Sequence, residues 1–292
     1  MNRASHHQHN LLVTGASGRV GRLLAAAWVK EASPVVLQYR GPGAPGGELD
    51  SLRWELAGGD APLRDWVATH GVPRAMLVLA GATPGSGRDL SLNRALAVAC
   101  LRAARAGGIG RVLVASSSAV YGGGRARGWA ESDRVRPTSD YGRAKLDMEA
   151  ACAEWRARGL DVCCLRIGNV AGADALLLNA ATPPLRIDRF ADGAGPLRSY
   201  IGPQSMARVL LALARAPGAL PPVLNLAAPQ PVAMTDLVGA AGLEWRGAAA
   251  PATAVQRFTL DCRALAERVA FSATESTAAE IVAQWKACRT PT

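Results

Sequence analysis

The chain has 292 residues, of which 49% are hydrophobic and 19% charged, as in a globular protein with a full core. No apolar run reaches the roughly 20 residues that span a bilayer, and the polar start lacks the apolar segment of a signal peptide, so we expect a cytoplasmic protein without a membrane partner. The net charge of +10 comes mostly from arginines scattered singly along the chain, which argues against nucleic acid as the ligand. The six cysteines show no C-x-x-C spacing, so we expect reduced thiols and no metal site.

Strand and helix patterns alternate over the first 170 residues. Apolar runs and helical periodicity predict strands at 11–13, 35–39, 54–56, 75–80, 112–115 and 162–167, and helices at 22–30, 63–69, 90–106 and 141–158. Residues 41–47 form a Gly/Pro-rich loop. The alternation predicts an α/β fold with a Rossmann-type, doubly wound parallel sheet.

Beyond Val170 the alternation breaks down. Proline and glycine become frequent, and the clear elements are a helix at 205–215, a strand at 223–226 and a last helix at 277–288. We therefore expect a cofactor-binding Rossmann domain over residues 1–170, to which residues 203–227 return. Residues 171–292 are expected to form a smaller substrate-binding region.

Three glycines, Gly15, Gly18 and Gly21, lie between the first strand and the first helix. A dinucleotide fingerprint must occupy this place, because glycine lets the backbone approach a pyrophosphate at the helix N-terminus. The second strand ends in Gln38-Tyr39-Arg40, without the acid that usually binds the adenine ribose. Arg40, with Arg19 close by, predicts a pocket for the 2′-phosphate of NADP; the alternative is that Arg40 is a solvated loop arginine.

Tyr141 and Lys145 are four residues apart, so a helix would place both side chains on one face. A nearby cation stabilises a phenolate and makes tyrosine a usable acid-base group, although the alternative is a packed tyrosine beside a solvated lysine. The hydroxyls of Ser116, Ser117 and Ser118 follow a buried strand, where they should face the cofactor.

Four motifs in this order carry a family resemblance: Thr14 to Gly21, Ser116 to Gly122, Tyr141 to Lys145, and Leu165 to Gly172. Over about residues 10 to 230 the chain resembles the extended short-chain dehydrogenases/reductases, the NAD(P)-dependent epimerase/dehydratase family. The resemblance implies that Tyr141 is the catalytic acid-base. It also implies that Lys145 orients the nicotinamide ribose and lowers the pKa of the tyrosine.

The resemblance implies further site residues. Ser117 would bond the reacting oxygen, and Ser118, Asn169 and Arg198 would contact the substrate. The residues expected to contact the cofactor, NADP in preference to NAD, are Gly15, Ser17, Gly18, Arg19, Val20, Gly21, Arg40, Leu79, Ala80, Gly81, Asn93, Ala115, Tyr141, Lys145 and Ile167.

The expected chemistry is hydride transfer at a carbonyl or carbinol carbon of a sugar nucleotide or related small molecule. Ser118 and Ala119 stand where a dehydratase often has an acid pair, which favours a ketoreductase or an epimerase. The stretch from Ala171 to Leu197 is short for a segment that usually holds a nucleotide diphosphate. A non-catalytic NAD(P)-binding regulator is the alternative from another class.

Two apolar stripes raise the question of a homodimer. They consist of Leu92, Leu96, Ala99 and Ala103 on one expected helix and Leu146, Ala150 and Ala153 on another. Related proteins often pair these helices across a symmetry axis, so we expect a dimer. The alternative is that both stripes only cover the sheet.

Overall fold

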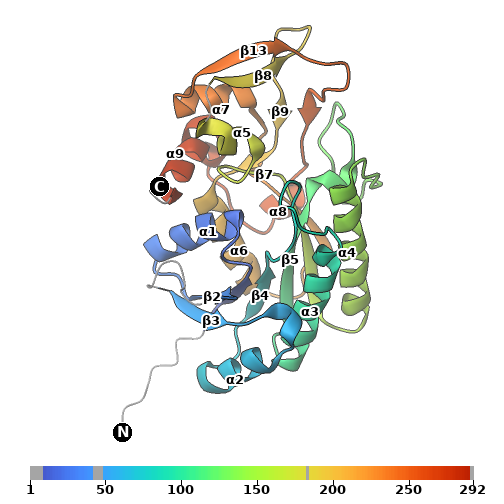
Figure 1. Ribbon diagram of the computed structural model, residues 1–292, viewed down its shortest axis with the longest axis vertical. Coiled ribbons are helices and arrows are strands. Elements are labelled where there is room, and N and C mark those ends of the chain that lie inside the picture. Colours follow the sequence, from blue (N-terminus) through green and yellow to red (C-terminus); the bar gives the residue numbers. More distant parts are fainter. Residues whose placement is uncertain (1–8, 42–48, 182–183, 290–292) are drawn as a thin grey trace.

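A seven-stranded parallel sheet forms the centre of the computed structural model, which describes residues 9–41, 49–181 and 184–289 (Figure 1). The strand order is β11-β6-β5-β4-β1-β2-β3. The strands are β1 (Leu11–Thr14), β2 (Val35–Tyr39), β3 (Asp50–Arg53), β4 (Ala75–Val78), β5 (Arg111–Ser117), β6 (Asp161–Ile167) and β11 (Val223–Leu226). The central strands are buried on both faces, which explains their continuous apolar runs.

Helices cover both faces of this sheet (Figure 1). One face carries α1 (Arg19–Lys30) and α6 (Pro203–Arg215), and the other carries α2 (Ala61–His70), α3 (Leu92–Ala106) and α4 (Asp140–Ala157). Because side chains alternate along a strand, Leu11 and Val13 pack in the core under α1, whereas Leu12 packs in the core under α3. The doubly wound Rossmann-type fold expected from the sequence is therefore confirmed.

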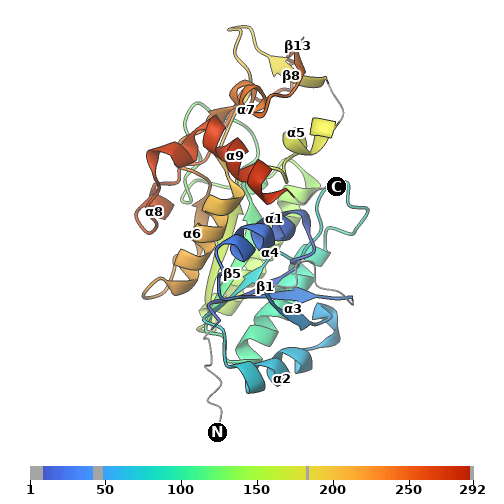
Figure 2. The ribbon, with the colours of Figure 1, turned by 90° about the vertical axis from the view of Figure 1, so that its left-hand side faces the viewer.

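The C-terminal part consists of short elements above the carboxyl edge of the large sheet (Figures 1 and 2). Its small sheets have the orders β10-β7, β12-β9-β14 and β13-β8. The strands are β7 (Asn169–Val170), β8 (Leu185–Arg189), β9 (Leu197–Arg198), β10 (Tyr200–Ile201), β12 (Val232–Ala233), β13 (Trp245–Ala249) and β14 (Arg257–Phe258). The helices are α5 (Ala175–Leu178), α7 (Met234–Ala241), α8 (Arg263–Ala266) and α9 (Ala278–Cys288).

Two expectations about the elements need correction. The strand expected at 54–56 lies earlier, at Asp50–Arg53, and a short 3₁₀ helix occupies Leu56–Gly58. Only Leu52 of this edge strand is buried, so it lacks the apolar run that marks a strand, whereas Trp54 is buried just after it. The strands of the C-terminal part, β11 excepted, and helices α5, α7 and α8 were not predicted. Of the Gly/Pro-rich loop at 41–47, all but Gly41 lies outside the described residues.

Strand β11 returns to the large sheet and pairs with β6 along Val223–Leu226. The boundary between a cofactor domain and a substrate region remains a prediction. All six cysteines are buried and unpaired. Among the helices described, none is long and apolar enough to cross a membrane.

The two stripes proposed for a dimer differ in exposure. On α3, Leu96 and Ala103 are buried, which fits a stripe that covers the sheet. On α4, Ala150 and Ala153 are exposed to solvent. The homodimer therefore remains a prediction. Of the two stripes, the one on α4 has exposed residues that could contact a second copy of the chain.

Candidate active site

A cavity of about 510 Å³ lies at the carboxyl edge of the large sheet. The ends of β1, β5 and β6 contribute the glycine loop, Ser117 and Ile167, and α4 contributes Tyr141 and Lys145. Parallel strands bring residues far apart in sequence to this one edge, where open α/β sheets bind their ligands. We call it the catalytic cavity.

The glycine loop has a backbone that other residues could not adopt. Gly15 has a φ of +74°, and a Cβ there would lie 2.5 Å from the backbone nitrogen of Ala80 at the end of β4. A Cβ on Gly21 would lie 2.5 Å from the carbonyl oxygen of Ala16. Gly18 caps α1 without a side-chain hydrogen bond, so the first amides of the helix have no capping side chain. Such amides donate hydrogen bonds to phosphate oxygens, and the loop therefore fits the pyrophosphate of a dinucleotide.

Tyr141 stands in the first turn of α4, where the Ser139 hydroxyl accepts a hydrogen bond from the Gly142 amide and fixes the start of the helix. Burial raises the pKa of Tyr141, and a side-chain hydrogen bond with Ser117 opposes that shift. The causes of this shift do not include Lys145, from which we expected a lowering of the pKa. The Lys145 ammonium lies 5.9 Å from the centroid of the tyrosine ring.

Lys145 is a buried cation, with 6% of its surface exposed. Its Nζ donates a hydrogen bond to the carbonyl oxygen of Ala115 at 2.7 Å. Burial lowers the pKa of Lys145 to about 8. The solvated lysine considered as an alternative is therefore wrong, and the ammonium is held inside the cavity wall with donors left for a ligand.

Asn93 supports the floor of the same cavity. Its side chain is fully buried, accepts a hydrogen bond from the Ala82 amide and donates to the carbonyl oxygens of Ala82 and Leu90. A Cβ on Gly81 would lie 2.5 Å from its Oδ1. Asn93 therefore fixes the loop after β4, in the place where the sequence put it.

A second cavity of about 270 Å³ continues from the glycine loop toward the end of β2. It contains the predicted residues Ser17 and Arg40, together with Glu55, which the sequence analysis missed. Gln38 fixes its wall, because its Oε1 accepts from the Gly15 amide at 2.9 Å and its Nε2 donates to the Trp54 carbonyl. Glu55 was missed because the strand expected at 54–56 placed it inside a strand instead of at the loop that follows β3.

Arg19 does not share this second cavity with Arg40. It lines the catalytic cavity instead, beside Arg22. Arg19 is the first residue of α1, directly after the Gly18 cap. The joint contact of Arg19 and Arg40 with one phosphate, expected from the sequence, finds no support in this placement.

The three residues expected to contact substrate have different positions. Asn169 lines the catalytic cavity. Ser118 is absent from its walls, where Ser116 stands instead. The guanidinium of Arg198 donates to the carbonyl oxygens of Leu197, Val255 and Gln256. These bonds hold β9 against the segment before β14.

Several cavity residues carried no recognisable signal in the sequence. Arg88 lies between the two cavities and donates to the Gly81 carbonyl at 3.3 Å. Asp174 lines the catalytic cavity as well; it accepts from the Tyr200 hydroxyl at 3.0 Å, and burial raises its pKa. Among the described residues, no cluster of three His, Cys, Asp or Glu side chains could hold a metal ion.

The fold and the motifs agree with comparisons to known proteins. The model of the NAD dependent epimerase/dehydratase family matches residues 11–211. The uncharacterized protein y4nG of Sinorhizobium fredii is 32% identical over 165 residues, which are 55% of this chain and 41% of that protein. The match thus spans less than half the length of this curated relative.

Solved structures extend the similarity to nearly the whole chain. MoeE5, in complex with UDP-glucuronic acid and NAD, is 26% identical with a TM-score of 0.71, covering 94% of this chain and 98% of that one. A UDP-glucose 4-epimerase from Brucella ovis, in complex with NAD, is 21% identical with a TM-score of 0.76, covering 94% and 96%. At that lower identity the second similarity concerns the fold alone.

Proposed function

Because the chain belongs to the NAD dependent epimerase/dehydratase family, we propose that it is an enzyme that transfers hydride between a nicotinamide cofactor and a carbinol or carbonyl carbon. One observation carries this proposal. Tyr141, its hydrogen-bond partner Ser117 and the buried Lys145 meet in the cavity that the glycine loop borders. A regulator that only senses the cofactor would not need this set.

The cofactor would lie along the two connected cavities. The α1 amides behind Gly18 would hold its pyrophosphate, Lys145 would donate to its nicotinamide ribose, and Glu55 and Arg40 would contact its adenosine end. The nicotinamide ring supplies the hydride acceptor or donor. The protein groups supply the proton transfer and the positioning.

Tyr141 would move the proton at the substrate hydroxyl, and Ser117 would bond the same oxygen and hold it in line. The raised pKa of Tyr141 keeps the phenol protonated in the free protein, so it starts as a proton donor. Lys145 carries the positive charge that would stabilise the phenolate. A carbonyl would thus be reduced, and the reverse transfer would oxidise a carbinol.

We propose an epimerase or reductase in preference to a dehydratase. Elimination of water needs an additional acid-base pair, and Ser118 and Ala119 provide none. Among the described residues that line the catalytic cavity, the carboxylate is that of Asp174, which is already bonded to Tyr200 and to the amides of Gly172 and Leu176.

The substrate class we propose is a sugar nucleotide. MoeE5 holds UDP-glucuronic acid, and here Asn169, Arg19 and Arg22 all line the catalytic cavity. Cationic and amide donors suit a diphosphate. For the cofactor we propose a preference for NADP, since Arg40 offers a guanidinium at the adenosine end.

The test is turnover of UDP-glucose and UDP-glucuronic acid by the purified protein with NAD or NADP. Products would be separated by chromatography, and reduced nicotinamide would be followed by absorbance. An epimer formed without net change in cofactor identifies an epimerase, whereas stoichiometric cofactor oxidation with a keto substrate identifies a reductase. The proposal fails if cofactor binds and neither reaction occurs with sugar nucleotides or simple carbonyl compounds.

A further inference from the structure

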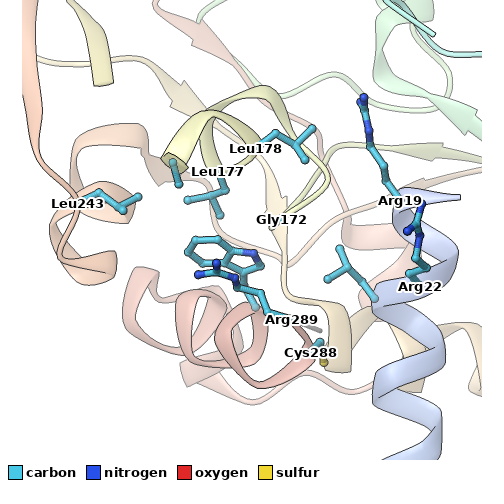
Figure 3. A pocket seen from close by; sticks show the side chains of 11 residues that line it. Arg19, Arg22, Gly172, Leu177, Leu178, Leu243, Cys288 and Arg289 are labelled. Atoms are coloured by element: carbon cyan, nitrogen blue, oxygen red, sulfur yellow. The ribbon is translucent and has the colours of Figure 1, made fainter. Parts of the chain in front are cut away.

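A third cavity, of about 330 Å³, lies between α1, α5 and α9. Figure 3 shows the residues that line it: Arg19 and Arg22 come from α1, Leu177 and Leu178 from α5, and Arg289 from the end of α9. We call it the arginine–leucine cavity. It shares Arg19 and Arg22 with the catalytic cavity, so the two hollows meet at the start of α1.

The charged side chains that line this cavity are all positive. Three guanidinium groups line it, and its described lining contains no aspartate or glutamate. Within the described chain, none of the ion pairs involves Arg19, Arg22 or Arg289, whereas arginines such as Arg111 and Arg166 are paired with carboxylates. Arg22 uses its Nε to bond the Ser17 carbonyl at 3.0 Å, which leaves its terminal nitrogens free to bind an anion.

The walls between the arginines are apolar. Leu177 and Trp285 are 3% and 5% exposed, and Leu178 at the rim is 40% exposed. Leu178 is one of two large hydrophobic side chains exposed in the described residues, the other being Val72. An apolar side chain left in water next to unpaired cations suggests a ligand with both an apolar part and a negative charge.

The cavity also touches the loop that carries the substrate residue Asn169. Gly172 in this loop has a φ of +87°, and a Cβ there would lie 2.2 Å from Cδ1 of Trp285. The indole is therefore packed directly on the loop backbone. Asn169 and Ala173 of the same loop line the catalytic cavity, so one short segment borders both hollows.

We propose that the arginine–leucine cavity binds a phosphate ester with an apolar or aromatic group. The phosphate contacts Arg22 and Arg289, whose guanidinium lies 5.1 Å from the centroid of the Trp285 ring and covers it, and the apolar group packs on Leu177 and Leu178. Two sources share this chemistry: a separate small effector, or the distal part of a substrate whose reacting end lies at Tyr141. Binding itself requires no turnover, so the proposal stands independently of the catalytic function.

The first test uses phenyl phosphate as the probe, with inorganic phosphate and phenol as its two halves, titrated calorimetrically into protein saturated with NAD. Saturation keeps the probe from the pyrophosphate position at α1. We expect phenyl phosphate to bind at least tenfold more tightly than either half. Affinity no better than that of inorganic phosphate overturns the proposal.

Matched variants locate the site. Arg289→Gln should weaken phenyl phosphate binding about tenfold, as loss of one charge-assisted contact predicts, while Lys286→Gln on the same helix removes the same charge outside the cavity and should have no effect. Leu178→Ser should weaken binding, and Val72→Ser, at the other exposed apolar residue, should not. All four residues are exposed at the surface, so the variants should fold. Equal affinity in Arg289→Gln, Leu178→Ser and wild type would place the probe elsewhere and refute the assignment.

A competition experiment separates the two sources. If UDP displaces phenyl phosphate and Arg289→Gln weakens both, the cavity receives the distal part of a sugar-nucleotide substrate. If UDP leaves phenyl phosphate bound, the cavity receives a separate phosphate ester. In either case Arg289→Gln must weaken the binding of phenyl phosphate.

Discussion

The cofactor-binding half and the C-terminal part of this chain obtain their architecture in different ways. In the first, the parallel strands of the large sheet bring the glycine loop, Ser117 and Ile167 to one edge, and α4 adds Tyr141 and Lys145. Each motif there is a few residues long and directly follows a strand or opens a helix. In the second, strands of two to five residues pair across long separations, as β8 (Leu185–Arg189) does with β13 (Trp245–Ala249). A local motif can identify chemistry in the first half, whereas the second half exists only through tertiary contacts.

The largest expected effect tests the chemistry of the first half. Tyr141→Phe removes the proton carrier and keeps the ring, so kcat should fall about 10²–10⁴-fold with cofactor affinity unchanged. Steady-state kinetics and a cofactor titration by fluorescence measure both. The control is Tyr121→Phe, which deletes a buried hydroxyl bonded to Asn225 outside the cavity. It should lower stability and leave kcat within a few-fold, and a loss below tenfold in Tyr141→Phe would contradict the assignment.

The next prediction compares the two halves by their ion pairs. Arg166 and Glu149 are both 7% exposed, and Glu149 also accepts from the Ser116 hydroxyl at 2.5 Å. Glu149→Ala leaves an unpaired buried guanidinium beneath the active site and should cost about 3–5 kcal/mol of unfolding free energy.

Its counterpart in the C-terminal part is Glu275, which pairs with Arg208, itself 40% exposed. Because solvent screens this pair, Glu275→Ala should cost about 1–2 kcal/mol, including the loss of its capping contact with Ser272. Urea unfolding of both variants provides the measurement. Equal losses of unfolding free energy would show that the stability of the two halves depends equally on these ion pairs.

A tenfold to hundredfold change in NADPH affinity is expected from Arg40, in the cavity proposed for the adenosine end of the cofactor. If Arg40 binds the 2′-phosphate, Arg40→Ala should weaken NADPH binding by that factor, as for loss of a charge-assisted contact of ~1.5–3 kcal/mol, with little change for NADH. Arg19→Ala serves as the comparison. Since Arg19 lies in the other cavity, it should leave the ratio of NADPH to NADH affinity unchanged. Equal affinity of the wild-type protein for both cofactors would mean that Arg40 does not bind the 2′-phosphate and is an ordinary surface arginine.

The smallest effect is a pH dependence from Lys145. Its pKa in the folded protein is about 8, below its ordinary value of 10.5, so the folded state disfavours the charged form. Between these two values the unfolded chain binds more protons, and the contribution of Lys145 to stability therefore rises with pH from about 8 toward 10.5. Cofactor affinity should change in the opposite direction, falling above about pH 8 as the ammonium donor is lost. Lys145→Met should abolish both trends, measured by urea unfolding and cofactor titration across that range; trends unchanged in the variant would exclude Lys145 as their source.

The sequence predicted most of the first half because its signals are local. Gly15, Gly18 and Gly21 mark the loop by their spacing, and Tyr141 and Lys145 share a face by theirs. It could not place Arg19, because the direction in which a side chain leaves the first turn of a helix depends on what packs around it. It also could not show that the Arg198 guanidinium would donate to the backbone carbonyls of Val255 and Gln256, which lie 57 and 58 positions further along the chain.

The return of β11 to the large sheet has a consequence for how the protein is made. During synthesis β6 emerges before β11, and the pairing of Val223 with Cys164 must wait for about sixty further residues. Until then β6, an apolar strand, is an unpaired sheet edge able to pair with another chain. A cofactor-binding fragment cut at residue 170 would keep that edge permanently. Residues 171–222 must therefore be synthesised before the last strand can pair, so the large sheet is completed only after part of the C-terminal half has been made.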